Sequence, residues 1–131
     1  PAEVQAHVLD PHRVAGNTRM LARCLANLVE NASRHASSTV DITLTTSPDG
    51  SPVVQIDDDG PGIPEDRLET IFERFARVDD ARNRREGGAG LGLSIAREIA
   101  KQHRATLSAS NRPGGGARFE LAFEDSSGID S

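Results

Sequence analysis

The sequence contains no tryptophan, no tyrosine, one cysteine and four phenylalanines among its 131 residues. Proteins commonly hold single-stranded nucleic acid by stacking bases on aromatic rings, so the scarcity of rings argues against such a function. A formal net charge of −5 argues the same way, because nucleic-acid binding normally needs an excess of basic residues. Cys24 has no partner for an internal disulfide, which fits a reducing compartment, and its place in an apolar helical pattern predicts packing rather than chemistry.

Long hydrophobic runs are absent too. No apolar stretch approaches the roughly 18 residues that a membrane-spanning helix needs, and the N-terminus has no signal-peptide pattern. We therefore expect one soluble domain that is long enough to bury a core and makes no direct membrane contact. The charge is uneven, since residues 74–86 hold five arginines against three acidic residues. An acidic protein with one basic segment suits a small polyanion as ligand.

Hydrophobic periodicity predicts the order of the elements. The expected strands cover residues 4–9, 40–46, 53–56, 106–110 and 117–123. The expected helices cover residues 18–35, a segment that starts at Pro64, and residues 91–103. Glycine-rich and proline-rich segments at 47–51 and 111–116 are predicted to be hairpin turns, and residues 125–131 are predicted to form a disordered acidic tail.

A glycine cluster, Gly88, Gly90 and Gly92, leads directly into the last predicted helix. Glycine permits close approach to a ligand, and the free amides of a helix N-terminus attract anions. The spacing matches neither the dinucleotide-binding fingerprint nor a P-loop, so the residues alone support a helix cap as well as a phosphate site. The preceding residues, about 76–89, are too charged to bury, which predicts a mobile lid.

Two further polar clusters stand out. Asn27, Asn31 and Arg34 share one face of the first helix beside its apolar stripe; asparagine is a poor helix former, yet a solvated face explains the pattern slightly better when it is taken alone. Three carboxylates, residues 57–59, end a strand and precede a loop rich in glycine and proline. An acidic turn or a calcium site remains an alternative, although consecutive acidic residues do not fit an EF-hand.

Four motifs follow one another in a fixed order: an Asn27 to Asn31 helix, Asp58-x-Gly60-x-Gly62, Phe72-x-x-Phe75, and Gly88-x-Gly90-Leu91-Gly92-Leu93. Together they resemble the catalytic and ATP-binding domain of bacterial sensor histidine kinases, in the superfamily that also holds DNA gyrase, Hsp90 and MutL ATPases. The resemblance implies that residues 1–124 form the Bergerat ATP-binding fold. This is an α/β (α+β) two-layer sandwich whose mixed, mainly antiparallel sheet of about five strands is covered on one face by about three helices.

The resemblance also implies roles for the first two motifs. Asn31 would give its side-chain oxygen to Mg²⁺, Asn27 would lie near the same metal and phosphates, and Arg34 would neutralise phosphate charge; these are the implied catalytic residues. His35 would lie near the nucleotide. Asp58 would accept a hydrogen bond from the adenine amino group, which guanine lacks at that position.

The other residues that the resemblance assigns to ATP binding are Gly60, Gly62, Ile63, Phe75, Arg77, Gly88, Ala89, Gly90, Leu91, Gly92 and Leu93. In the family the phenylalanine motif anchors the lid, and the last glycines meet the triphosphate. Ala89 stands where the family often has threonine or serine, so one hydroxyl contact to phosphate is missing. Arg104 and Ala105 replace a frequent pair of glycines, which is expected to alter a turn and not the site.

The same helix motif indicates the type of reaction. ATPases of the superfamily place a water-activating glutamate where this sequence has Asn27, which cannot act as a general base, and this favours a kinase. None of His7, His12, His35 and His103 has the context of a phosphoacceptor. We therefore expect the acceptor histidine on a separate dimerisation domain.

The resemblance implies a monomeric, cytoplasmic piece of a homodimeric sensor kinase, anchored in the bacterial inner membrane, that serves a response regulator indirectly. Two alternatives stay open. One is an anti-sigma-factor serine kinase of the same superfamily, although those chains usually carry glutamate at the position of Asn27. The other is a nucleotide-binding interaction module without catalysis, for which Ala89 is the hint.

Overall fold

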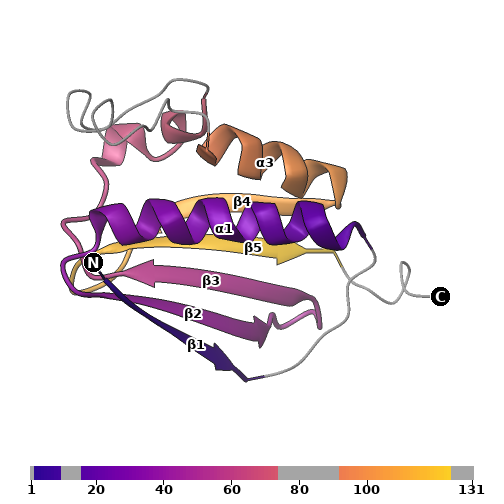
Figure 1. Ribbon diagram of the computed structural model, residues 1–131, viewed down its shortest axis with the longest axis horizontal. Coiled ribbons are helices and arrows are strands. Elements are labelled where there is room, and N and C mark those ends of the chain that lie inside the picture. The colour runs from indigo at the N-terminus through magenta and orange to yellow at the C-terminus, as the bar shows by residue number, and fades with distance from the viewer. Residues whose placement is uncertain (1, 10–15, 74–91, 125–131) are drawn as a thin grey trace.

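The computed structural model describes residues 2–9, 16–73 and 92–124, and its sheet has five strands in the order β1-β2-β3-β5-β4. The strands are β1 (Glu3–Val8), β2 (Thr39–Thr46), β3 (Pro52–Asp58), β4 (Ala105–Asn111) and β5 (Ala117–Phe123). β1 pairs with β2 in parallel, and the other three pairs are antiparallel. Helices α1 (Thr18–His35) and α3 (Gly92–Gln102) cover one face of this sheet (Figure 1). The predicted two-layer sandwich is confirmed.

Helix α1 has the predicted bounds, and both ends have a local cause. The Asn17 side chain accepts a hydrogen bond from the Met20 amide at 3.0 Å, which caps the first turn. The backbone amide of Asn17 in turn donates to Nε2 of His103, at the far end of α3, also at 3.0 Å. The helix ends where Ala36 adopts an extended backbone with ψ of 147°. The two helices are thus joined where α1 begins.

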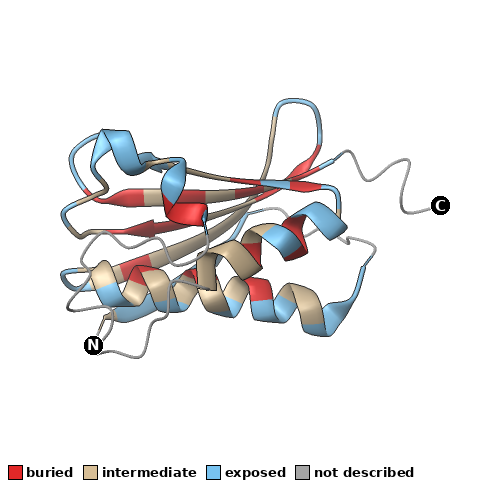
Figure 2. Ribbon diagram, turned by 90° about the horizontal axis from the view of Figure 1, so that it is seen from above, coloured by how far each residue is buried: buried red, intermediate tan, exposed pale blue. Residues whose placement is uncertain are grey.

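The core lies between the helices and the sheet, where the buried positions of both layers face one another (Figure 2). On α1 the buried stripe runs through Cys24, Leu28 and Ala32, each with no exposed surface. Burial raises the pKa of the Cys24 thiol to about 11, and the thiol donates to the Ala96 carbonyl oxygen at 3.5 Å. The prediction that Cys24 serves packing is therefore confirmed.

The helix predicted to start at Pro64 is wrong within the described residues. The segment forms two short 3₁₀ turns, η1 (Glu65–Arg67) and η2 (Thr70–Phe72), so two α-helices are described and not three. No side chain caps either turn, and helices of this length are marginal without such support. The second turn instead inserts Ile71 and Phe72 into the core, with 6% and 4% of their surfaces exposed.

Arg104, two residues beyond the end of α3, is one of the residues expected to alter a turn. Arg104 has φ of 57°, the left-handed conformation that usually takes glycine at a helix C-terminus. Its amide donates to the Lys101 carbonyl at 3.1 Å, so the turn is formed despite the missing glycine. The predicted lid at about 76–89 and the tail at 125–131 lie outside the described residues.

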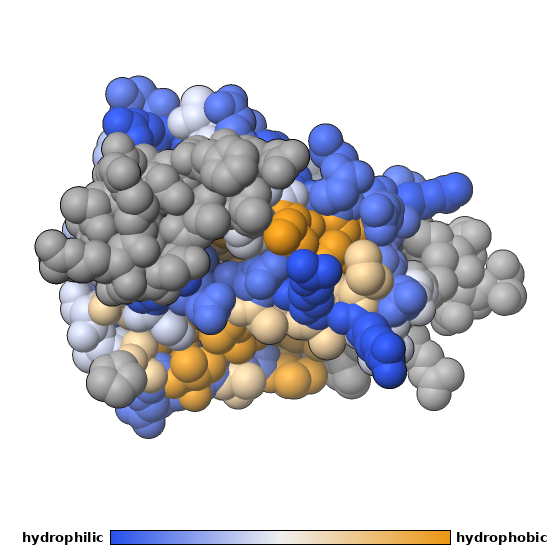
Figure 3. Space-filling view, turned by 45° about the horizontal axis from the view of Figure 1, so that its top comes forward, coloured by the Kyte–Doolittle hydropathy of each residue, from blue (hydrophilic) through white to orange (hydrophobic). Residues whose placement is uncertain are grey.

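The sheet edge at β1 is the least covered part of the described chain. Helix α1 lies against β2 and β3, and α3 lies against β4. Hydrophobic side chains appear on the surface (Figure 3), and the large ones that are exposed within the described ranges are Val4, Val8 and Leu9. In the same ranges no helix combines the length and hydrophobicity that a bilayer crossing requires.

Candidate functional site

A pocket opens between α1, the loop after β3, β5 and the first turn of α3. It encloses about 380 Å³, including open solvent. Its lining consists of Asn31, His35, Asp58, Gly62, Ile63, Ile71, Leu93, Ala117 and Phe119. Only the first three of these carry polar side chains, and a mostly apolar cleft with a few polar groups is the usual form of a small-molecule site.

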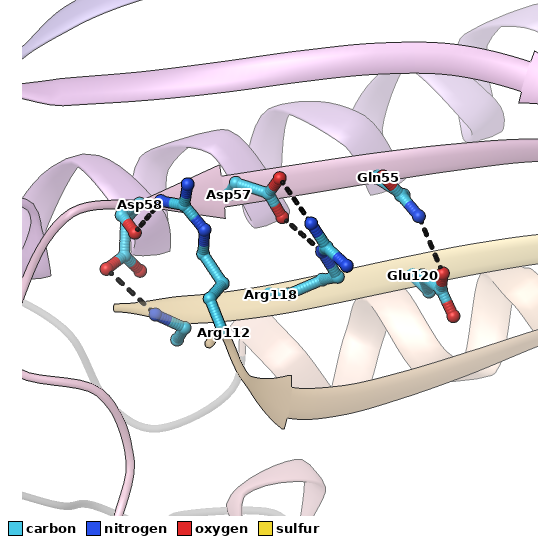
Figure 4. Close-up of polar contacts among 7 residues, drawn as sticks. Gln55, Asp57, Asp58, Arg112, Arg118 and Glu120 are labelled. Atoms are coloured by element: carbon cyan, nitrogen blue, oxygen red, sulfur yellow. Dashed lines mark hydrogen bonds and ion pairs between the residues drawn. The ribbon is translucent and has the colours of Figure 1, made fainter. Parts of the chain in front are cut away.

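Asp58 is the most buried polar group of the pocket, with 2% of its surface exposed. Its Oδ1 accepts hydrogen bonds from the backbone amides of Gly60 at 2.8 Å and Ala117 at 3.3 Å. Its carbonyl oxygen accepts from Nη1 of Arg112 at 2.8 Å (Figure 4). No described group donates to Oδ2. The carboxylate is therefore held in one orientation, and the described part of the chain leaves its second oxygen as an acceptor for a ligand.

The two flanking aspartates have other partners, as strand alternation predicts. Asp57 forms a two-bond ion pair with Arg118 at 2.8 and 3.2 Å, in line with the neighbouring bond from Gln55 to Glu120 (Figure 4). The Asp57 carboxylate raises the pKa of the Arg118 guanidinium. This pair belongs to the sheet face away from the helices and takes no part in the pocket.

Asp59 accepts hydrogen bonds at the entry to β2. Its carboxylate accepts from the backbone amides of Ser37, Ser38 and Thr39 at 2.8 to 3.2 Å, and from the Ser38 hydroxyl at 2.7 Å. The bonds from Ser38, followed by the one from Thr39, lower the pKa of this carboxyl. Asp59 thereby fixes the loop after β3 against the segment that follows α1.

The residues predicted on α1 divide into two groups. Asn31 and His35, one turn apart, line the pocket, whereas Asn27 and Arg34 are not among the lining residues. Nη1 of Arg34 lies 4.0 Å from Oε1 of Glu30, an ion pair across one turn. Pairs of this kind near the surface contribute little to stability, so this cation is available to a stronger anion.

The glycines of the loop after β3 have a structural reason of their own. A Cβ on Gly60 would lie 2.0 Å from the His35 carbonyl oxygen, so the missing side chain lets the loop pack on the end of α1. Gly62 has φ of 86°, which favours glycine, and lines the pocket. Only Gly62 of the two lies on the pocket wall.

Part of the predicted ATP-binding set lies outside the described residues: Phe75, Arg77, Gly88, Ala89, Gly90 and Leu91. Its last two positions are described. Gly92 begins α3, and Leu93 lines the pocket in the first turn of that helix. Six predicted site residues therefore meet in one pocket: Asn31, His35, Asp58, Gly62, Ile63 and Leu93.

Sequence reasoning missed Ile71, Ala117 and Phe119 as lining residues. The alternating pattern of β5 marks Phe119 as facing inward, but nothing in the sequence separates a pocket wall from the rest of the core. Phe72 packs against Phe119, with the two rings edge to face and their centroids 6.0 Å apart. The Arg97 guanidinium lies over the Phe72 ring, 4.4 Å from its centroid.

The donors available for a metal are few. Within the described ranges, no group of three or more His, Cys, Asp or Glu residues is placed to hold an ion. The Asn31 amide oxygen still fits Mg²⁺, which keeps several waters and is usually bound through one or two protein oxygens together with substrate phosphates. The donor set therefore suits a metal that arrives with a phosphate ligand.

Residues 16–127 match the model of the family described as histidine kinase-, DNA gyrase B-, and HSP90-like ATPase. The chain belongs to this family. Within the ATPase family, its curated relatives include the sensor histidine kinase YkoH of Bacillus subtilis, 37% identical over 115 residues, which cover 88% of this chain and 25% of the relative. The sensor histidine kinase CpxA of Escherichia coli is 42% identical over 112 residues, which cover 85% of this chain and 24% of the relative.

Solved structures agree with this membership of the ATPase family. A mycobacterial sensor histidine kinase, MprB, superposes with a TM-score of 0.80 at 27% identity and covers 93% of this chain and 80% of its own. The catalytic domain of the histidine kinase ThkA gives 0.76 at 26% identity, with 93% and 78% covered. The domain is thus of the sensor-kinase catalytic type, as the four motifs predicted, and it spans about a quarter of the curated relatives named above.

Proposed function

We propose that this domain binds Mg-ATP and supplies the γ-phosphoryl group to a histidine on a dimerisation domain outside this chain. The observation that carries the proposal is the Asp58 carboxylate, 2% exposed, anchored through Oδ1 and free at Oδ2 among the described residues. The parent protein is then a homodimeric, membrane-anchored sensor kinase whose catalytic domains lie in the cytoplasm. It signals to a response regulator through the phosphorylated histidine.

The pocket chemistry supports adenine as the base. The adenine amino group donates a hydrogen bond, whereas guanine carries a carbonyl at the equivalent position, so a carboxylate acceptor favours adenine. Ile63, Ile71, Leu93 and Phe119 supply apolar surface for a flat ring. Full-length ShkA, whose solved structure contains AMPPNP, superposes on this chain with a TM-score of 0.77 at 25% identity, covering 93% of this chain and 25% of its own.

The asparagines of α1 support phosphoryl transfer rather than ATP hydrolysis. Asn31 would hold Mg²⁺ together with the phosphates, and the bound metal would offset phosphate charge. Asn27 lies one turn earlier and has no carboxylate to activate water. Phosphoryl transfer needs mainly positioning and charge neutralisation, so a nucleophile from another domain completes the site.

The two other functions considered from the sequence have less support. The relatives named above are sensor kinases, and none is an anti-sigma-factor kinase. Failure of Mg-ATP to bind at millimolar concentration, measured by titration calorimetry of this 131-residue chain, would favour an interaction module that has lost its chemistry. A module that still binds nucleotide would differ from our proposal in transferring no phosphoryl group.

Two variants test the site itself. We expect Asn31→Ala to weaken ATP binding only when Mg²⁺ is present, and Asp58→Asn to reduce the preference for ATP over GTP about tenfold or more, because a charge-assisted hydrogen bond is lost. Asp66→Asn, an exposed change in η1, is the matched control. Unchanged affinity and selectivity in both site variants would contradict the assignment.

Phosphoryl transfer needs its own measurement. We expect no label in this chain after incubation with γ-labelled Mg-ATP, and label in a histidine-bearing dimerisation domain once that domain is added. Asn31→Ala should slow the transfer in parallel with its weaker binding. Strong incorporation into this chain alone would rule out the proposed division of labour.

A further inference from the structure

The Asn111 side chain at the end of β4 contacts the pocket loop from 48 residues away in the sequence. Its Oδ1 accepts a hydrogen bond from the Ile63 amide at 2.7 Å, and its Nδ2 donates to the Ile63 carbonyl at 2.8 Å. One carboxamide thus serves both backbone groups of one residue, as a neighbouring strand would. Two bonds of opposite direction fix the position and the rotation of that peptide segment.

No other described group shares this task. Within residues 2–9, 16–73 and 92–124, both hydrogen bonds of the Ile63 backbone go to Asn111. Gly60 and Gly62 precede Ile63, and glycine gives a backbone more freedom than any other residue. An Ala at position 62 would also place its Cβ 2.8 Å from Oδ1 of Asn111, which shows how closely the loop packs on this amide.

The rest of the β4–β5 hairpin contacts Asp58, a polar residue of the same pocket. Arg112 donates to the Asp58 carbonyl at 2.8 Å (Figure 4). The Ala117 amide donates to the Asp58 carboxylate at 3.3 Å. The sequence predicts no more than a hairpin turn here. In the structure this turn fixes both Asp58 and Ile63, and both residues line the pocket.

We propose that Asn111 is a positioning residue for the nucleotide base: it fixes the backbone of Ile63, an apolar residue of the pocket that Asp58 also lines. The inference rests on the proposed function, because it takes the pocket ligand to be ATP. Asn111 is not one of the lining residues, so it acts through Ile63 and not by contact with the base. Its role is therefore separable from the chemistry at the phosphates.

The first test compares three variants of this chain. We expect Asn111→Ala to weaken binding of ATP, ADP and AMP by about the same factor, roughly tenfold, because the base and not the phosphates loses its wall. Asn111→Asp keeps the side-chain shape and the acceptor, but it places an oxygen next to the Ile63 carbonyl oxygen where the wild type has a donor. This variant should therefore bind the nucleotides as weakly as Asn111→Ala. Ser110→Ala, an exposed neighbour on the other face of β4, should bind like the wild type.

Two further measurements separate positioning from simple destabilisation. With a histidine-bearing domain supplied, Asn111→Asp should raise the KM for ATP and leave kcat unchanged. The Ile63 amide should exchange with solvent at least tenfold faster in both Asn111 variants than in the wild type, without any nucleotide. If Asn111→Ala does not fold, the isosteric Asn111→Asp alone decides.

The outcomes distinguish the inference from its basis. Wild-type affinity in Asn111→Asp, or unchanged Ile63 exchange, would overturn the positioning role and leave ATP binding intact. Failure of the wild-type chain to bind Mg-ATP would overturn the proposed function, and with it the role toward the base. If the Asn111 variants lost different factors of affinity for ATP, ADP and AMP, the positioning role toward the base would also be overturned, because the change would then act on the phosphates.

Discussion

Strand β3 has an acidic, glycine-containing turn at each end, and the two turns are held in different ways. The turn before the strand, residues 47–51, is closed by its own members. The Ser47 amide donates to the Ser51 carbonyl and the Gly50 amide to the Ser47 carbonyl, both at 2.9 Å. The Ser51 amide donates to Oδ1 of Asp49 at 3.0 Å, and the Ser47 hydroxyl bonds the same oxygen. Each of these bonds joins two members of the turn.

The loop after the strand depends on distant elements. Asp59 is bonded to Ser38, 21 residues earlier, and Ile63 to Asn111, 48 residues later. Asp58 is bonded to Ala117, 59 residues later. The loop that lines the pocket is therefore the one whose shape is imposed by the end of α1 and by the β4–β5 hairpin. A rigid scaffold that positions a loop is the usual setting for a binding site.

The largest effect should come from Gly116, where the hairpin meets the strand end. Gly116 has φ of 94°, and a Cβ there would lie 2.0 Å from the Asp58 carbonyl oxygen. We expect Gly116→Ala to lower the free energy of unfolding by about 4 kcal/mol, because backbone strain and a backbone clash add. Denaturant unfolding followed by circular dichroism measures this.

Gly114 is the matched control in the same turn. It has φ of 91°, but a Cβ there would meet nothing within 4 Å. Gly114→Ala should therefore cost only the conformational term, about 1 kcal/mol. Equal losses in the two variants would mean that the clash with Asp58 is relieved by movement and that the hairpin does not fix the strand end.

A second pair compares the two turns of β3 directly. Gly60→Ala would bring a Cβ to 2.0 Å from the His35 carbonyl oxygen, whereas Gly50→Ala, at φ of 90°, would enter open space. We expect Gly60→Ala to cost about 3 kcal/mol and Gly50→Ala about 1 kcal/mol. ATP affinity should fall with the first change only. A larger loss for Gly50→Ala would remove the distinction between the two turns.

The third prediction concerns the pH dependence of the loop after β3. Hydrogen bonds from Ser38 and Thr39 hold the pKa of Asp59 below its ordinary value of about 3.9. The unfolded chain therefore takes up protons at acidic pH that the native state does not. The stability that Asp59 contributes is complete above about pH 5 and is lost as the pH falls through and below the unfolded pKa.

Asp59→Asn tests this directly, because it removes the charge and keeps the shape. We expect a clearly lower melting temperature at pH 7 and a shallower loss of stability between about pH 4 and pH 2 than in the wild type. Asp66→Asn, on an exposed side chain, should leave both unchanged. If the stability of Asp59→Asn fell between about pH 4 and pH 2 as steeply as that of the wild type, Asp59 would not be the group responsible.

Local patterns allowed most of the fold to be predicted. The α1 bounds, five strands and both hairpins follow from periodicity and turn residues, because each depends on neighbours in the chain. The segment after Pro64 was mispredicted because its apolar residues suit a helix, while anchoring of Ile71 and Phe72 in the core selects short turns. Tertiary packing overrode a local preference there.

The site was predictable where a motif stands in one stretch of sequence. Asp58 and Asn31 could be named from their motifs, and the structure brings both to one pocket. Asn111 could not be named, because its role depends on its hydrogen bonds to Ile63. No local signal in the sequence marks a side chain that bonds a loop 48 residues away. Residues that shape a site from a distance require the tertiary structure.

The smallest effect is expected at Asp49, in the self-contained turn. Hydrogen bonds from Ser47, then from Ser51, lower the pKa of this carboxyl, as happens at Asp59, but the backbone bonds within residues 47–51 remain when the charge is removed. We expect Asp49→Asn to lower the melting temperature at pH 7 by less than Asp59→Asn does. It should reduce the loss of stability at acidic pH only slightly and leave ATP affinity unchanged. Thermal melts at pH 7 and pH 3, with ATP titrations, measure all three. A fall in ATP affinity at Asp49→Asn would show that the far turn of β3 also influences the pocket, and the two turns would then differ in degree and not in kind.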